Sequence, residues 1–174
     1  MNRRDVLKLS GGAALGLAAA PVLAGSVREP ASMLALFDAR FAASRAFAQA
    51  ARRSGARAVA TEGDIPSLWH GALRGAPLAR LAGVTTYADM VAIAALAGEA
   101  RQSFALQIAH VMQGDAVEHR LVEGPAGALK LLAAAGAEWP EGCWSLAARE
   151  VRPSGGATPR AHAPGATLWS WAIA

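Results

Sequence analysis

The sequence predicts a three-layer α/β domain whose mixed sheet is parallel in its N-terminal half and antiparallel toward the C-terminus. Three observations lead to this fold class. An apolar run over residues 33–37 ends in Asp38, which is typical of a strand covered on both faces. A stretch of helical period and a second apolar run follow it. Residues 167–173 alternate with the period of a strand.

The first half of the domain is expected to be a strand, a helix and a second strand. Polar residues recur on one stripe of residues 40–54, small and aromatic residues occupy another stripe, and Gly55 follows as a stop signal. The apolar residues 58–61 then form the second strand. This spacing is that of a parallel strand pair joined by a crossover helix.

Two further helices and a short strand are expected next. Asp64 is the predicted N-cap of a short helix with Pro66 in its first turn. Residues 82–84 are expected as a third strand. Thr86 and Asp89 then resemble a capping box, with Asp in place of Glu, at the start of a longer apolar helix.

The second half is expected to begin with an antiparallel hairpin and to end on two strands. The hairpin joins residues 104–112 to residues 119–122, and a helix over 126–135 stops at Gly136. A loop at 139–142 and a strand at 144–151 are expected next, followed by an exposed Pro/Gly-rich connector at 153–165. The last strand, at 167–173, would place Trp169, Trp171 and Ile173 on one face.

The N-terminus has the pattern of an export signal. Residues 3–9 read Arg-Arg-Asp-Val-Leu-Lys-Leu, and a Gly/Ala-rich apolar stretch follows to about Leu23. That stretch is too short and too rich in Gly and Ala to span a bilayer stably. We expect residues 1–24 to be a removable twin-arginine signal peptide, residues 25–32 a tether and residues 33–174 a single α/β domain. Gly25 and Ser26, and no Cys, stand directly after Ala24, so the signal is not of the lipid-anchored kind and we expect a soluble mature protein with no stable membrane anchor.

Arg3 and Arg4, with the apolar stretch behind them, make the chain similar to small proteobacterial proteins that carry a twin-arginine signal peptide. The resemblance covers residues 3–24 only. It implies export in the folded state by the twin-arginine translocase, and therefore a periplasmic location, but it implies no reaction. The mature part resembles no catalytic family.

Composition narrows the classes of function further. Loss of residues 1–24 lowers the formal net charge from +4 to +2, which is 14 basic less 12 acidic residues. An exported protein meets no chromosome, so we expect no nucleic-acid partner. The single Cys143 cannot form an internal disulfide, and we expect a buried, inert thiol.

The main candidate site follows from the rule that open α/β sheets bind ligands beyond the carboxyl ends of their strands. Backbone N–H groups at helix N-termini there could help to hold a polar or anionic ligand. The alternative is structural: two of these residues would cap helices, and the Asp and Arg nearest the first strand would pair with each other. The candidate ligand-binding residues at the strand ends are Asp38, Arg40, Asp64, Thr85, Thr86 and His110.

Trp69 and His70 form a second candidate, because an indole beside an imidazole on a short helix often borders a pocket. The alternative is that Trp69 packs onto the sheet while His70 faces water.

His110 and His119 could face each other across the hairpin and, with Asp115 or Glu118, supply borderline metal ligands. Their spacing matches no specific metal motif, so we expect an unliganded pair and predict no metal site. The chain also lacks a Gly-rich nucleotide loop, paired cysteines and a haem attachment motif, and its cofactor stays unknown.

Two functions remain open at this stage. The first is an accessory or binding protein of the cell envelope, possibly a small subunit or partner of a larger periplasmic redox enzyme. Its contact surface would be Trp169 and Trp171, or the apolar helix that follows Thr86. The second is a protein that binds, or an enzyme that acts on, a small polar or anionic ligand at the strand-end cluster, with His110 or Asp38 as general base. Whether the chain is an enzyme is left open.

Overall fold

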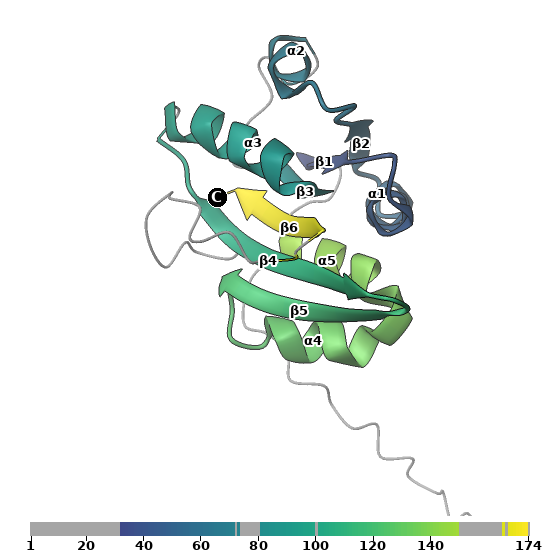
Figure 1. The fold of residues 1–174 in the computed structure, drawn as a ribbon. Coiled ribbons are helices and arrows are strands. Elements are labelled where there is room, and N and C mark those ends of the chain that lie inside the picture. Colours follow the sequence, from purple (N-terminus) through teal and green to yellow (C-terminus); the bar gives the residue numbers. More distant parts are fainter. Residues whose placement is uncertain are drawn as a thin grey trace, which may run out of the picture.

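The structure is a computed structural model that describes residues 32–71, 73, 81–99, 101–149, 165 and 167–173. Its centre is a six-stranded mixed sheet in the order β2-β1-β3-β6-β4-β5, with helices on both faces (Figure 1). The predicted α/β class and its mixed sheet are therefore confirmed. The expected signal peptide and all but residue 165 of the expected 153–165 connector lie outside the described residues.

The parallel half of the sheet follows the predicted order. The strand β1 (Leu34–Phe37) pairs in parallel with β2 (Arg57–Ala60) on one side and with β3 (Leu81–Thr85) on the other. The helix α1 (Ala42–Arg53) connects β1 to β2 and buries Phe47, Ala48, Ala50 and Ala51, while its arginines face outward. The helices α2 (Ile65–His70) and α3 (Tyr87–Glu99) flank β3 in the chain.

The antiparallel half contains β4 (Phe104–Gln113), β5 (Ala116–Glu123) and β6 (Leu168–Ile173). The strands β4 and β5 form the predicted hairpin, and β6 inserts between β3 and β4, antiparallel to both. It follows that β4 runs in the same direction as β1, β2 and β3. The carboxyl ends of these four strands therefore lie along one edge of the sheet.

The segment after Gly136 differs from the prediction. A 3-10 turn (Gly136–Glu138) follows α4 (Ala128–Ala135), and residues Trp139–Ala147 form the helix α5, so the predicted loop at 139–142 and strand at 144–151 are wrong. Pro140 stands in the first helical turn, where its missing N–H costs nothing. A Cβ at Gly142 would lie 3.1 Å from side-chain atoms of Leu131 and Leu132, so this glycine allows α4 and α5 to pack closely rather than forming a turn.

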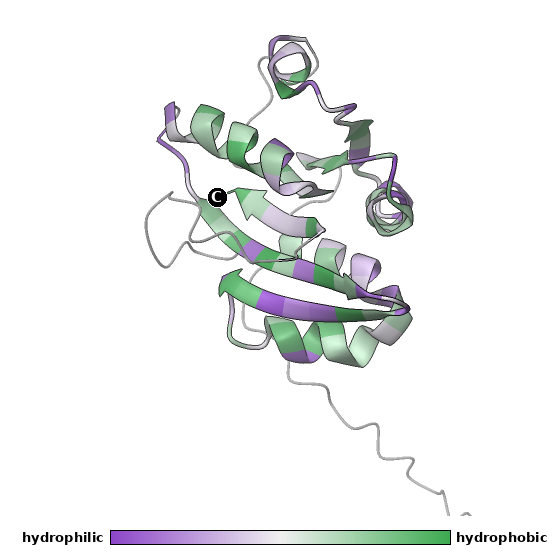
Figure 2. Cartoon of the chain, in the orientation of Figure 1, coloured by the Kyte–Doolittle hydropathy of each residue, from purple (hydrophilic) through white to green (hydrophobic). Residues whose placement is uncertain are grey.

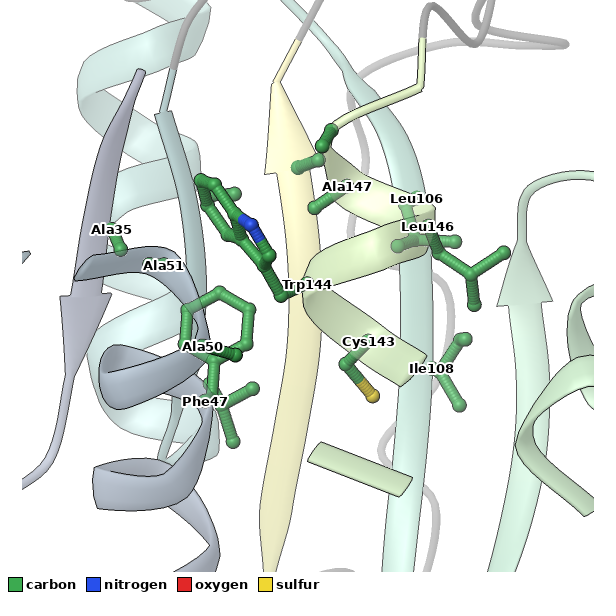
Figure 3. Close-up of a cluster of buried hydrophobic side chains, with 14 of the residues drawn as sticks. Ala35, Phe47, Ala50, Ala51, Leu106, Ile108, Cys143, Trp144, Leu146 and Ala147 are labelled. Carbon is green, nitrogen blue, oxygen red and sulfur yellow. The ribbon is translucent and has the colours of Figure 1, made fainter. Parts of the chain in front are cut away.

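Each face of the sheet has its own apolar core. On one face, Trp144 of α5 lies edge-on to Phe47 of α1, with ring centroids 5.7 Å apart (Figure 3). On the other face, α3 covers Trp169 and Trp171, whose exposed fractions are both 0%. Strongly hydrophilic residues interrupt the edge strand β5, whereas β6 in the middle of the sheet carries none (Figure 2).

The predicted face of Trp169, Trp171 and Ile173 is confirmed, because all three belong to the core beneath α3. The expectation that the two tryptophans form an exposed contact surface is wrong. Each indole is large and apolar, and the sheet and α3 remove it from water.

Candidate functional site

The structure accounts for Asp38 and Arg40 as a pair. The guanidinium Nη2 lies 2.6 Å from Oδ2 of Asp38, and Nε lies 3.0 Å from Oδ1. The Asp38 side chain is 4% exposed and that of Arg40 69%. Hydrogen bonds from the Arg40 side chain, opposed in part by burial, lower the pKa of Asp38. The carboxylate already has a cationic partner, so its structural interpretation is confirmed.

The other strand-end residues also have structural partners. Asp64 caps α2 by accepting a hydrogen bond from the Ser67 backbone N–H at 3.0 Å. Thr86 Oγ1 accepts from the Asp89 backbone N–H at 3.3 Å, as the predicted cap requires. Thr85 is buried, and its hydroxyl accepts a hydrogen bond from Nε1 of Trp171 at 3.0 Å. These contacts use the groups that were expected to meet a ligand.

Trp69 and His70 also follow the structural alternative. Trp69 is half-buried and packs against the core beneath α3, while His70 is exposed at the last position of α2. Neither residue lines the groove described below.

The predicted strand-end cluster is divided between the two faces of the sheet. Thr85 contacts Trp171 on the α3 face. His110 lies on the opposite face, where Cys143 and Trp139 of α5 are its neighbours. Side chains alternate along a strand, so residues at the same edge can point into different layers. His110 therefore does not join Thr85 in one cleft.

His110 and His119 do meet across the hairpin, as predicted. They stand opposite each other in the register of β4 and β5, and their Nδ1 atoms are 2.8 Å apart. The other ring nitrogen of His110, Nε2, lies 2.6 Å from the hydroxyl of Ser170 on β6. The thiol of Cys143 lies 3.9 Å from the same nitrogen. Four polar side chains from three strands and one helix thus form a continuous chain of polar contacts, which is buried at Cys143, Ser170 and His110 and half-buried at His119.

Burial keeps the histidines and the thiol of this hydrogen-bonded series uncharged at neutral pH. His110 is 0% exposed, and burial first, then the nearby His119, place its pKa well below the usual value. Burial also lowers the pKa of the half-buried His119. The pKa of the Cys143 thiol is raised to about 12 by burial, against the opposing effect of a hydrogen bond to Ser170. The buried thiol predicted from the sequence is confirmed.

The alternative of a metal site finds no support in the part of the chain that the structure describes. No group of three or more His, Cys, Asp or Glu side chains is arranged there so that it could hold a metal ion. Glu118, one of the suggested ligands, is instead held by Arg120 through contacts of 2.8 and 2.9 Å.

An open groove of about 850 Å³ runs beside this histidine pair. It lies at the edge where β1 and β4 end, which is the edge to which the strand-end rule points, but none of the predicted strand-end residues lines it. The residues that line it are Ala42, Ala43 and Ala46 of α1; Met112, Asp115, Ala116, Val117 and His119 of the β4–β5 hairpin; Leu129, Leu132 and Ala133 of α4; Gly136 and Ala137 of the 3-10 turn; and Trp139 and Pro140 of α5.

Sequence reasoning missed this groove because its walls are mostly alanine and leucine, which carry no chemical signal. The one indication was the expected pairing of His110 with His119, of which only His119 lines the groove. Trp139 connects the two features, since its ring centroid lies 4.2 Å from that of His110 and 5.3 Å from that of His119. The site thus combines a mostly apolar surface with two polar side chains, the imidazole of His119 and the exposed carboxylate of Asp115 in the hairpin turn.

Comparison of the chain with protein-family models, with curated proteins and with solved structures finds no match. None of the helices among the described residues has the length and apolar character needed to cross a membrane.

Proposed function

We propose that this chain is an exported periplasmic binding protein that holds a small, mainly apolar molecule in the groove between α1, α4 and the β4–β5 hairpin. The observation that carries this proposal is the groove itself, with its apolar walls and the single imidazole of His119. Small-molecule sites in proteins have this character, with apolar lining and few polar groups that orient the ligand. A volume of about 850 Å³ falls within their usual range.

The groove favours ligand binding over the accessory-subunit hypothesis in its original form. Of the two contact surfaces expected for that hypothesis, Trp169 and Trp171 are buried, which leaves the outer face of α3. A role beside a larger periplasmic enzyme remains compatible with the proposal if the groove carries a molecule that such an enzyme uses. The strand-end residues Asp38 and Arg40 are not part of the proposed site, because they pair with each other.

Export through the twin-arginine translocase is the second component of the proposal. It rests on Arg3 and Arg4 and on the apolar stretch that follows them. Replacing both arginines by lysine should leave unprocessed precursor in the cytoplasm, measured by fractionation and mass spectrometry. Normal appearance of that variant in the periplasm would contradict this part of the proposal.

Native mass spectrometry of the protein isolated gently from the periplasm tests the binding function. We expect an added mass of a few hundred daltons on the wild-type chain. Ala133→Phe places a benzyl group in the groove and should abolish the added mass, whereas Ala134→Phe changes an exposed neighbour on the same helix that does not line the groove, and should retain it. Equal retention by both variants would place the ligand elsewhere, and a bare chain in every sample would leave the groove without a ligand.

A further inference from the structure

We infer that the groove selects a molecule carrying an uncharged hydrogen-bond acceptor, such as a carbonyl oxygen, and that Nε2–H of His119 is the donor that recognises it. This inference rests on the proposed function, because it assigns the ligand chemistry of the same groove. Its basis is the direction of the hydrogen bonds along the buried chain from Cys143 to His119.

The contacts of Ser170 decide which groups donate and which accept along this series of hydrogen bonds. Its hydroxyl has two polar neighbours among the described residues, Nε2 of His110 at 2.6 Å and the thiol of Cys143. A ring nitrogen with a lone pair is a strong acceptor, whereas a thiol is a weak acceptor and a weak donor. The arrangement that satisfies all three groups has the thiol donating to the Ser170 oxygen and the hydroxyl donating to Nε2 of His110.

The proton positions on both histidines follow from that bond. An uncharged His110 whose Nε2 accepts must carry its only proton on Nδ1. It therefore donates from Nδ1 to Nδ1 of His119, 2.8 Å away. An uncharged His119 that accepts on Nδ1 must carry its own proton on Nε2.

The opposite direction satisfies the buried chain less well. His119 would donate to His110, His110 would donate to Ser170, and the Ser170 hydroxyl would be left with the Cys143 sulfur as its acceptor among the described neighbours. Fully buried polar groups are rarely left with so weak a partner, because each unmade hydrogen bond costs stability. Ser170 and His110 are 1% and 0% exposed, so water does not replace the missing acceptor.

This series of hydrogen bonds ends at the groove, with His119 as its last member. Nδ1 of His119 is turned to the buried His110, so Nε2–H is the polar group that this side chain offers to the groove. Within the described part of the chain, Nε2 of His119 has no hydrogen-bond partner, and aliphatic residues such as Leu129 and Leu132 line the same groove. The carboxylate of Asp115, in the exposed hairpin turn, also lines the groove but is an acceptor, so His119 is the donor. A ligand that excludes water from this surface must supply an acceptor, or the N–H is left unpaired.

Three tricyclic probes of nearly equal size and shape test this assignment. Fluorene has no polar group, fluorenone has only an acceptor, and carbazole has only a donor. We would measure their dissociation constants for the purified protein at pH 7 by titrating its ¹H–¹⁵N NMR spectrum. We expect fluorenone to bind about threefold to tenfold more tightly than fluorene, which is the usual range for one hydrogen bond, and carbazole to bind no more tightly than fluorene.

The variants separate this inference from the proposed function. His119→Phe keeps an aromatic ring in the groove wall and should make fluorene and fluorenone bind equally. Binding of all three probes should be weakened by Ala133→Phe and not by Ala134→Phe. Equal binding of the probes to the wild-type protein, or a preference for carbazole, would overturn the assignment and leave the groove as a binding site. If no probe binds, or if Ala133→Phe weakens none of them, the proposed function fails and this inference fails with it.

A second measurement needs no ligand and no variant. Long-range ¹H–¹⁵N spectra of the histidine rings distinguish protonated from unprotonated nitrogens in the native protein. We expect protons on Nδ1 of His110 and on Nε2 of His119. A proton on Nδ1 of His119 would reverse the direction of the chain and overturn the inference.

Discussion

Gly83 packs directly against the fully buried indole of Trp171, so Gly83→Ala should destabilise the fold strongly. The residue stands directly opposite Trp171 in the register of β3 and β6. A Cβ built on Gly83 would lie 2.4 Å from Cζ2 and 2.6 Å from Cε2 of that indole. Trp171 is in turn fixed by its hydrogen bond of 3.0 Å to Thr85 and by an edge contact with Phe104 at 5.9 Å between ring centroids.

The magnitude follows from these contacts. Forcing an extra methyl group into a packed core costs about 1–3 kcal/mol, and displacing the indole from Thr85 removes a buried hydrogen bond worth about 1 kcal/mol. We therefore expect Gly83→Ala to lower the free energy of unfolding by about 2–4 kcal/mol. The same change at Gly98, an exposed position in α3 with nothing within 4 Å of the added Cβ, should instead raise it by about 0.5–1 kcal/mol.

Urea unfolding of the two variants, followed by circular dichroism, measures the difference. Trp171→Phe removes the indole atoms nearest to Gly83, so the cost of Gly83→Ala should be smaller in that background. If Gly83→Ala were as stable as Gly98→Ala, or cost the same with and without Trp171, the packing described here would be refuted.

Three further predictions concern buried polar groups. Because the pKa of His110 is lowered in the folded protein, the unfolded chain binds more protons below about pH 6.5. The free energy of unfolding should therefore fall as the pH decreases from 6.5, by up to about 1.4 kcal/mol per pH unit for this residue, as urea titrations between pH 7 and pH 5 would show. A flat profile would contradict the burial of a neutral ring. Iodoacetamide at pH 8 should label Cys143, whose pKa is about 12, only after unfolding, as mass spectrometry would show; rapid labelling of the native protein would show that the thiol is accessible. Ser44→Ala should lower the free energy of unfolding by about 1–3 kcal/mol, because the buried Ser44 hydroxyl donates to the Val84 carbonyl and accepts from the Asp38 backbone N–H. A loss below about 0.5 kcal/mol, the size of a surface effect, would mean that these two backbone groups find other partners.

Local pattern was sufficient for most of the elements. Apolar runs, helical stripes and caps act over a few neighbouring residues, and the predicted strand at 33–37, the cap at Asp64 and the hairpin after Phe104 all appear in the structure. The facing pair of His110 and His119 was also predicted, because a hairpin with a short turn fixes which residues stand opposite each other.

The error at α5 shows where local reasoning fails. Gly142 and Pro140 suggested a loop, since glycine and proline interrupt most regular elements. In the structure Pro140 occupies the first helical turn and Gly142 lies against α4. Whether a glycine is a turn or a packing contact depends on a neighbouring helix, which the local sequence does not describe.

The candidate site was decided by tertiary structure. The sequence placed Asp38, Thr85 and His110 at strand ends, but the alternation of side chains sent His110 to the opposite face of the sheet from Thr85. The insertion of β6 between β3 and β4 brought Ser170 to His110 across 60 residues of chain. Such contacts depend on which strands pair and which helices pack against them, and burial of the whole apolar surface selects that arrangement. Composition and period describe only the segments from which it is built.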